Sequence, residues 1–209
     1  MYKLFFLLIF CLTSLPLAAQ EAKEAQAVLC ARTGNVECLQ KELRANRSAI
    51  FKKDKHGNTL LAVAAIHGQN RVVNLLADQW AKWTELNKVG HTALHEAILH
   101  KKFSTAQLIL DLAEDDWELD FDRFINTPTM DRNRATPLHL AAGHCEHELY
   151  ESLLRMGADE TRQDARGKTP KAVLSRCPPK SKQKQVKGGL DKHSRPNTQQ
   201  HLNTQTTGR

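Results

Sequence analysis

The sequence predicts an all-α repeat protein built from stacked helical hairpins. A threonine followed by a short apolar segment, typical of a capped helix start, recurs at Thr59, Thr92, Thr136 and Thr169. The steps between these threonines are 33, 44 and 33 residues, and such a recurrence indicates a stack of similar units. Aromatic residues make up 6% of the chain, which suits thin helix pairs better than one large core.

The segment 136–142 shows the pattern best. Thr136 is a good N-cap, and Pro137 stands at the first helical position, where its missing N–H costs nothing. The residues at 138–142 then give a narrow face with small side chains, which lets a second helix approach closely. The pattern returns at 59–65 and 92–98 and begins again at 169–173.

A period of about 33 residues around a Thr-Pro-Leu-His-x-Ala core resembles the ankyrin-repeat family. The resemblance implies an ankyrin-repeat solenoid over residues 20–177, with about four helix-hairpin repeats and a C-terminal half-repeat cap. The expected repeats cover residues 22–46, 54–80, 87–111 and 131–159, and the half-repeat covers 164–177. The first is degenerate and polar, as befits a capping repeat. The fourth lacks the usual turn glycine, so Asn133 is expected to take the left-handed conformation there.

The step from Thr92 to Thr136 is 11 residues too long, and the extra material lies within 112–133. This insertion begins with a run of acidic residues and contains Trp117, Phe121 and Phe124. Insertions in a solenoid fall on one face, often the binding face. Two interpretations stay open: an acidic and aromatic finger that binds a basic partner, or an extended second helix whose aromatics pack on the stack.

The N-terminus has the pattern of a secretory signal peptide over residues 1–19. Lys3 provides a positive start, an apolar run extends over 4–12, and small residues precede a cleavage site after Ala19. The apolar run is short for a membrane anchor. We therefore expect a periplasmic or secreted protein with no membrane span after cleavage.

The positive charge is concentrated at the other end of the chain. The formal net charge is +7, and residues 178–209 contain five Lys and two Arg against one Asp, a net charge of about +6. Few aliphatic residues occur there, so we expect a disordered basic tail. The remainder after the signal is close to neutral, which argues against a nucleic-acid surface on the folded domain.

Four cysteines remain once Cys11 leaves with the signal, an even number that permits two disulfides in an oxidising compartment. The register of the repeats favours Cys30 with Cys38, across the first hairpin, and Cys145 with Cys177, at equivalent sites of neighbouring repeats. The alternative is that these cysteines are free and fill small core positions.

Members of the ankyrin family are generally binding scaffolds, and the resemblance places the contacts with a protein partner at the turn tips and on the first helices. The tip residues expected to bind are Lys55, His56, Asn58, Lys88, His91, Arg132, Arg134, Arg166 and Lys168. Their basic character suggests a partner with acidic patches. Trp80, Trp83 and Trp117 are candidate aromatic anchors, although the first two equally suit an apolar lid over the helix ends.

No pattern for a nucleophile elbow, a P-loop or a dinucleotide fold occurs, so we expect neither an enzyme nor a cofactor. The cluster of His139, His144, Cys145 and His147 leaves metal binding as a weaker alternative. His139 and His95, however, stand where the family has a structural histidine.

The sequence thus resembles small exported bacterial ankyrin-repeat proteins. The function expected is that of a monomeric protein-binding scaffold, either a periplasmic adaptor or a protective partner of another exported protein. The alternatives are a secreted effector that binds a host protein and, less favoured, a His/Cys metal protein or enzyme.

Overall fold

The structure is a computed structural model that describes residues 26–79 and 82–178. The expected signal peptide, nearly all of the basic tail and Trp80 lie outside the described residues. Within the described part, no helix combines the length and the apolar content needed to cross a membrane.

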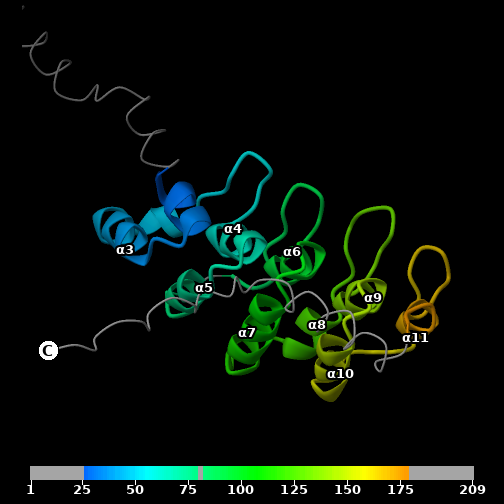
Figure 1. Ribbon diagram of the computed structural model, residues 1–209. Coiled ribbons are helices and arrows are strands. Elements are labelled where there is room, and N and C mark those ends of the chain that lie inside the picture. Colours follow the sequence, from blue (N-terminus) through cyan, green and yellow to red (C-terminus); the bar gives the residue numbers. More distant parts are fainter. Residues whose placement is uncertain (1–25, 80–81, 179–209) are drawn as a thin grey trace, which may run out of the picture. The chain divides into compact units, whose positions relative to one another are not determined.

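Antiparallel helix pairs follow one another along the chain, and Figure 1 shows them side by side in chain order. A first helix over 26–33 precedes the others. They are α3 (Val36–Ala45), the 3-10 helix η1 (Arg47–Phe51), α4 (Leu60–His67), α5 (Asn70–Ala77), α6 (Ala93–Leu99), α7 (Phe103–Glu114), α8 (Phe121–Ile125), α9 (Pro137–Gly143), α10 (His147–Arg155) and α11 (Pro170–Leu174). The expected all-α solenoid is confirmed.

Each repeated threonine begins a helix because its hydroxyl accepts a hydrogen bond from the backbone N–H three residues later. Thr59, Thr92, Thr136 and Thr169 cap α4, α6, α9 and α11 in this way. An N-cap of this kind is worth about 1 kcal/mol. The recurring threonine therefore fixes where the first helix of each repeat starts.

The helices pack in two rows. In the inner row α4 contacts α6, α6 contacts α9, and α9 contacts α11, while in the outer row α5 contacts α7 and α7 contacts α10. The small residues predicted to allow close approach are buried, including Ala64, Ala97 and Ala141 at 0% exposure. The hairpins thus share one continuous apolar core.

Each turn between the paired helices needs one residue in the left-handed region. That residue stands nine places after the threonine position, and it is Gly68 (φ 71°) in the second repeat, Lys101 (φ 57°) in the third and Cys145 (φ 58°) in the fourth. The left-handed region disfavours side chains with a Cβ, so Lys101 and Cys145 hold conformations that glycine would adopt more readily.

One expectation about the fourth tip is wrong. Asn133 does not take the left-handed conformation; Arg134 does, with a φ of 48°. Arg134 stands two residues before Thr136, the same place that Gly57 and Gly90 hold before Thr59 and Thr92. Because the register of the turn follows the helix start, the arginine occupies the glycine position despite its side chain.

The insertion mostly extends and covers the stack. The second helix of the third repeat, α7, has 12 residues, and the short α8 follows it with Phe124 and Ile125 almost fully buried. Trp117 is the exception, with 84% of its surface exposed. This supports the interpretation of an extended helix, with one aromatic side chain left in solvent.

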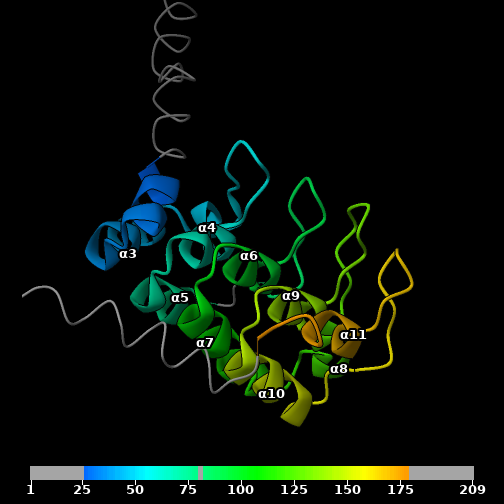
Figure 2. The same ribbon diagram turned by 45° about the vertical axis from the view of Figure 1, so that its right-hand side comes forward.

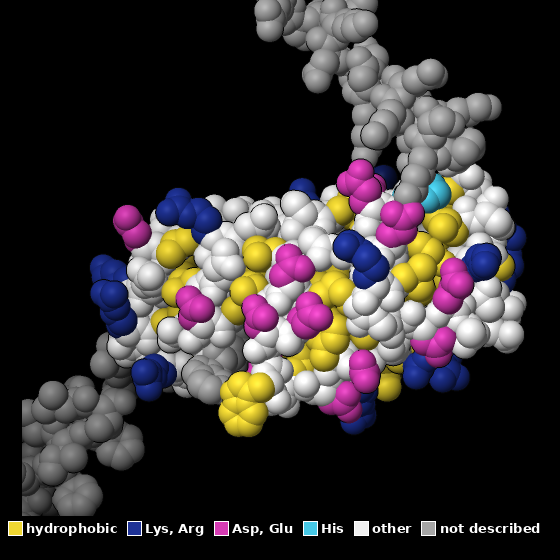
Figure 3. Space-filling model, turned by 90° about the horizontal axis from the view of Figure 1, so that it is seen from below, with side chains coloured by type: hydrophobic (Ala, Val, Ile, Leu, Met, Phe, Trp, Pro, Cys, Tyr) yellow, Lys and Arg dark blue, Asp and Glu magenta, His cyan; other side chains and the backbone are white. Residues whose placement is uncertain are grey.

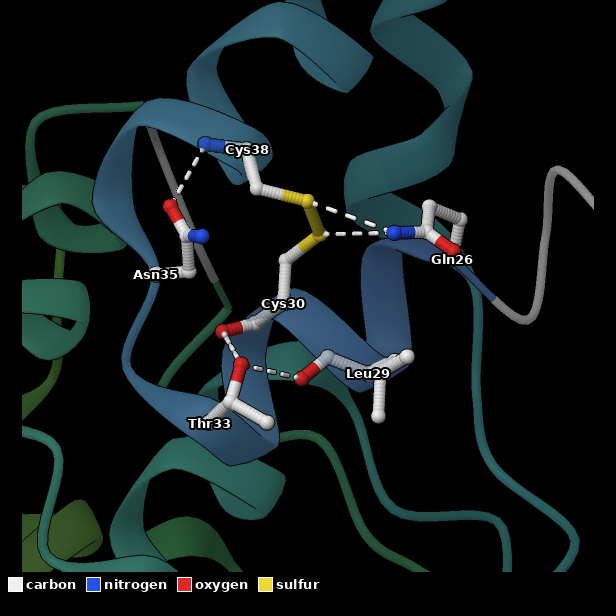
Figure 4. The surroundings of a disulfide bond; sticks show 6 residues. All are labelled: Gln26, Leu29, Cys30, Thr33, Asn35 and Cys38. Carbon is white, nitrogen blue, oxygen red and sulfur yellow. Dashed lines mark hydrogen bonds between the residues drawn. A yellow bond between two sulfur atoms is a disulfide. The ribbon is translucent and has the colours of Figure 1, made fainter.

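The structure joins the cysteines in the two pairs that the repeat register favours. Cys30 and Cys38 connect the helix over 26–33 to α3, with their Cα atoms 5.8 Å apart (Figure 4). Asn35, between them, accepts a hydrogen bond from the Cys38 N–H at 2.9 Å. Cys145 and Cys177 connect the fourth repeat to the half-repeat, with Cα atoms 5.4 Å apart. One disulfide thus lies within the first described repeat, and the other joins the fourth repeat to the half-repeat.

Candidate protein-binding surface

Four loops, the tips, project from the same side of the stack, one before each of α4, α6, α9 and α11 (Figures 1 and 2). Each tip takes the number of its repeat, so the tips before α4, α6 and α9 are the second, third and fourth, and the tip before α11 belongs to the half-repeat. The fold of each loop is set by one Asp or Asn, five residues before the threonine, whose side-chain oxygen accepts backbone N–H bonds from inside the turn. Asp54 accepts from His56 and Asn58, both at 2.8 Å. Asn87, Asp131 and Asp164 do the same in the next three tips, at 2.8–3.3 Å. Such turns hold the tips in a defined shape.

Backbone hydrogen bonds also join each tip to the next. The N–H of Lys88 donates to the carbonyl of His56 at 3.1 Å, and the N–H of Ala165 donates to the carbonyl of Asn133 at 2.8 Å. Between the third and fourth tips the N–H of Met130 donates to Gly90 at 3.1 Å. The four tips therefore form one connected edge rather than independent loops.

The fourth tip is wider than the others. In the second repeat the N–H of Asp54 donates to the carbonyl of Asn58, four residues on, whereas in the fourth the N–H of Thr129 donates to Ala135, six residues on. The Thr129 hydroxyl accepts the N–H of Ala135 and donates to Asp131. The insertion thus contributes residues to the base of this tip.

Most of the expected tip residues are exposed. The exposed cationic and histidine side chains at the four tips are Lys55, His56, Lys88, Arg132 and Arg166. Together they are called the tip surface. Lys168 is half-buried. The Lys88 ammonium donates to the carbonyl of Lys55 at 2.8 Å, so it also joins two tips. Arg134 is exposed too, but it lines a separate groove that is described below.

Three expected contact residues lie in the interior instead. Asn58 is 5% exposed and bonds to Asp54 and Asn87. The His91 ring contacts Glu96 at 3.0 Å, and its side chain is 11% exposed. Trp83 is 6% exposed, and its indole N–H donates to Asp116 at 2.9 Å, so it is a lid over the stack rather than an anchor. Asn58 and Trp83 thus link neighbouring repeats, and His91 bonds to Glu96 within the third repeat.

The structural histidines bridge successive repeats. The Nδ1 of His95 accepts the N–H of Thr92 at 3.2 Å, so Nε2 carries the proton and donates to the Thr127 carbonyl at 3.0 Å. Burial, together with the neighbouring His91, lowers the pKa of His95 from 6.5 to about 4. His95 is therefore neutral at physiological pH. His139 makes the same contacts with Thr136 and Lys168.

A buried carboxylate lies beside His95. Glu96 accepts from Asn87 at 2.7 Å and contacts His91, and His100 lies 3.4 Å away. Burial raises the pKa of Glu96, but the hydrogen bonds from His91 and Asn87 outweigh it and the pKa is lowered overall. Glu96 is thus an ionised group that ties the third tip to the end of α6.

Three further histidines stand at one repeat position, eight residues after the threonine. We call His67, His100 and His144 the histidine row; they lie at the C-terminal ends of α4, α6 and α9. Burial lowers the pKa of His67, and the nearby Arg32, His100 and Lys102 lower it further. Burial and Lys101 lower the pKa of His144. The equal spacing from Thr59, Thr92 and Thr136 was the signal in the sequence from which this row could have been found.

The metal alternative has little support in these contacts. Both ring nitrogens of His139 are engaged, and Cys145 is in a disulfide. Among residues 26–79 and 82–178, no group of three or more His, Cys, Asp or Glu side chains is arranged to hold a metal ion.

The opposite side of the stack has a different character. Figure 3 shows acidic side chains spread over this face, with hydrophobic side chains between them and most Lys and Arg near its rim. The outer helices α7 and α10 and the residues after α7 contribute exposed acids, which are Asp111, Glu114, Asp115 and Glu148. The cationic tips and this acidic face therefore give the stack two electrostatically distinct sides.

Comparisons with known proteins agree with the repeat architecture. A family model described as "Ankyrin repeats (3 copies)" matches residues 27–120 and 80–164. The chain is 36% identical to NF-kappa-B inhibitor alpha of Gallus gallus over 121 residues, which are 57% of this chain and 35% of that protein. It is 30% identical over 113 residues to ankyrin repeat and KH domain-containing protein 1 of Homo sapiens, covering 54% of this chain. It is 28% identical over 141 residues to inversin of Canis lupus familiaris, covering 68% of this chain.

The match spans only a small part of these larger relatives, 4% of the KH domain-containing protein and 12% of inversin. The similarity therefore concerns the repeats and not the whole relatives. The family model alone covers more than half of the chain, and the tips, caps and bridging histidines recur at the repeat positions of this chain. The chain belongs to the ankyrin-repeat family.

Proposed function

We propose that this chain is a protein-binding scaffold that acts outside the cytoplasm and binds an acidic surface of its partner through the tip surface. The observation that carries the proposal is the connected edge of tips, in which backbone hydrogen bonds hold exposed cations at fixed spacing. A tip backbone that is fixed before binding loses little conformational entropy when the partner arrives.

The family supports a binding role. Ankyrin-repeat proteins are typically non-catalytic binding proteins, and one relative bears the name of an inhibitor of NF-kappa-B. Acidic partners are favoured because the four successive tips expose Lys55, Lys88, Arg132 and Arg166 in turn. Complementary charge of this kind raises association rates and helps to exclude wrong partners.

Export is supported by two independent features. Residues 1–19 have the composition of a cleavable signal, and the four cysteines that would remain are paired in disulfides, which persist in oxidising compartments. Within that setting we favour a periplasmic adaptor or a protective partner of another exported protein. Intact-mass measurement of the protein purified from the periplasm should give a chain that begins at Gln20 with no free thiol; a full-length, reduced chain in the cytosol would contradict export.

The binding role is tested with two triple charge reversals that change net charge equally. The tip variant carries Lys55→Glu, Arg132→Glu and Arg166→Glu, and the control carries Lys41→Glu, Arg71→Glu and Arg155→Glu on the second helices. Cross-linked partners captured with the wild type should be lost with the tip variant and kept with the control. Equal capture by both variants would show that the tips are not the binding surface.

A further inference from the structure

A second surface lies apart from the tip surface, where the insertion meets the fourth tip. It is a groove of about 900 Å³, bounded by the segment before the third tip, the insertion and the residues after α10. Its apolar lining comes from Leu86, Leu119, Pro128 and Met130. The groove exists because the insertion adds α8 and the wider base of the fourth tip, which an ordinary repeat step of 33 residues would not supply.

Three arginines line this groove, and two of their guanidinium groups are free. Arg162 donates to the carbonyl of Asn126 at 3.1 Å and lies 3.6 Å from Asp159, so its position is fixed. Within the described part, the side chains of Arg123 and Arg134 have neither a hydrogen bond nor an ion pair. Both side chains are exposed and available to a ligand.

Most of the acidic residues of the lining already accept hydrogen bonds from groups of this chain. Asp120 caps α8 by accepting the N–H of Arg123 at 3.0 Å. Asp131 accepts from the Thr129 hydroxyl, from the backbone of the fourth tip and from the Asn133 amide. Glu118 is the remaining carboxylate and is exposed. Asp120 and Asp131 keep their negative charge but are held by bonds within the chain, so Glu118 is the one lining carboxylate left to pair with a ligand or with the two unpaired guanidinium groups.

We propose that this groove binds an extended acidic peptide segment of a partner protein. Carboxylates of the segment pair with Arg123 and Arg134, since the guanidinium fork matches a carboxylate with two parallel hydrogen bonds. An apolar side chain between them packs against Leu119, Pro128 and Met130. The volume is at the upper end of the range for small-molecule sites, which favours a peptide.

The mixed charge of the groove favours a peptide over a nucleic acid. Glu118, Asp120 and Asp131 lie along the same lining and would repel a continuous row of phosphates. A peptide can place its carboxylates at the two arginines and neutral residues elsewhere. The groove site goes beyond the proposed tip contact, because the side chains that form the two surfaces differ.

The full-length protein is titrated with a fluorescein-labelled peptide in which Glu alternates with Leu, and with a peptide in which Gln replaces each Glu. The acidic peptide should bind at least about tenfold more tightly than the Gln peptide, and less tightly at high salt. The double variant Arg123→Gln/Arg134→Gln should lose about tenfold or more in affinity, and Arg155→Gln on α10 should bind as the wild type does. Circular dichroism establishes that each variant is folded.

Arg134→Lys keeps the charge but not the fork, so an intermediate loss is expected. Binding should also shift the methyl signals of Leu119 and Met130 in NMR spectra. Unchanged affinity in the double variant would overturn the groove proposal. So would a loss confined to Arg132→Gln/Arg166→Gln, because the peptide would then bind the tip surface. That second result would leave the tip-binding function standing, so the two failures are distinguishable.

Discussion

The imidazole of His95 donates to the carbonyl of Thr127 at 3.0 Å, and this bond anchors the insertion to the third repeat. One repeat later His139 donates to Lys168, the residue just before the capping threonine. The equivalent of Lys168 in the fourth repeat is Ala135, but the His95 ring bonds to the carbonyl of Thr127 in the insertion and not to that of Ala135. The insertion therefore takes over a contact that the next tip normally makes.

His95 makes the stability of the stack depend on pH. Its pKa falls from 6.5 in the unfolded chain to about 4 in the folded protein. Between these values the unfolded chain binds a proton and the folded protein does not, so the free energy of unfolding decreases as the pH falls. Above pH 6.5 the His95 contribution is complete, and by pH 4 roughly 3 kcal/mol is lost.

Urea unfolding from pH 8 down to about pH 4.5 measures this loss. His95→Gln should be less stable at neutral pH, because the bridge to Thr127 is weakened, yet its stability should fall much less over this range. Glu96, with its lowered pKa, contributes mainly at more acidic pH. An equally steep decline in His95→Gln would assign the pH dependence to another group.

The repeat architecture could be predicted from the sequence because it depends on local signals. Thr59, Thr92 and Thr136 cap helices wherever the chain places them, and their spacing defines the stack. The buried roles of Asn58 and Trp83 could not be predicted, since both depend on partners about 30 residues away, Asn87 and Asp116. Polar side chains at a tip look alike in sequence whether they face solvent or a neighbouring tip.

The groove could not be predicted from the sequence for a related reason. The run of acids in 112–133 drew attention to negative charge, whereas the structure assembles Arg123, Arg134 and Arg162 from three separate segments. Asp120 and Asp131 stand out in the sequence as charges but act as caps of local structure. The pattern of charges along the chain therefore does not show which charged side chains are available to a ligand, because some acids are already hydrogen-bonded.

Lys101 offers a simple stabilising change. Its backbone has a φ of 57° at the position where Gly68 stands one repeat earlier. Lys101→Gly should raise the free energy of unfolding by about 1 kcal/mol, because glycine adopts this conformation without the Cβ penalty. Lys102→Gly is the matched control, since Lys102 has a φ of −91° and gains nothing from glycine. Chemical denaturation of both variants should move the midpoints in opposite directions.

Loss of either disulfide should lower the free energy of unfolding, but by different amounts. Cys145 and Cys177 are 32 residues apart, and Cys30 and Cys38 are 8 apart. In the chain-entropy model the longer loop gives the larger effect, by about 1 kcal/mol. Replacing Cys145 and Cys177 by Ser should therefore destabilise more than replacing Cys30 and Cys38.

Hydrogen exchange locates the effect of each replacement. Without the Cys145–Cys177 bond, amides of α11 should exchange faster while those of α4 change little, because only the half-repeat loses its covalent tie. Faster exchange throughout the stack would instead mean that the half-repeat is needed for the stability of every repeat.

Gly90 should be the least replaceable glycine of the tips. Its φ is 85°, and a Cβ built there would overlap the Cβ of Met130, whose N–H bonds to the Gly90 carbonyl. Gly167 has a φ of 72°, but the nearest atom to its Cβ position is 3.9 Å away. Gly167→Ala should thus cost about 1 kcal/mol for the backbone alone, and Gly90→Ala about 2 kcal/mol or more, since the fourth tip must also move.

Thermal unfolding of Gly90→Ala, Gly167→Ala and the double variant Gly90→Ala/Met130→Gly separates the two contributions. The double variant should recover part of the loss caused by Gly90→Ala, relative to Met130→Gly alone, because removing the Met130 Cβ relieves the overlap but not the backbone penalty. Equal losses for the two alanine variants would mean that the third and fourth tips are not in contact in solution.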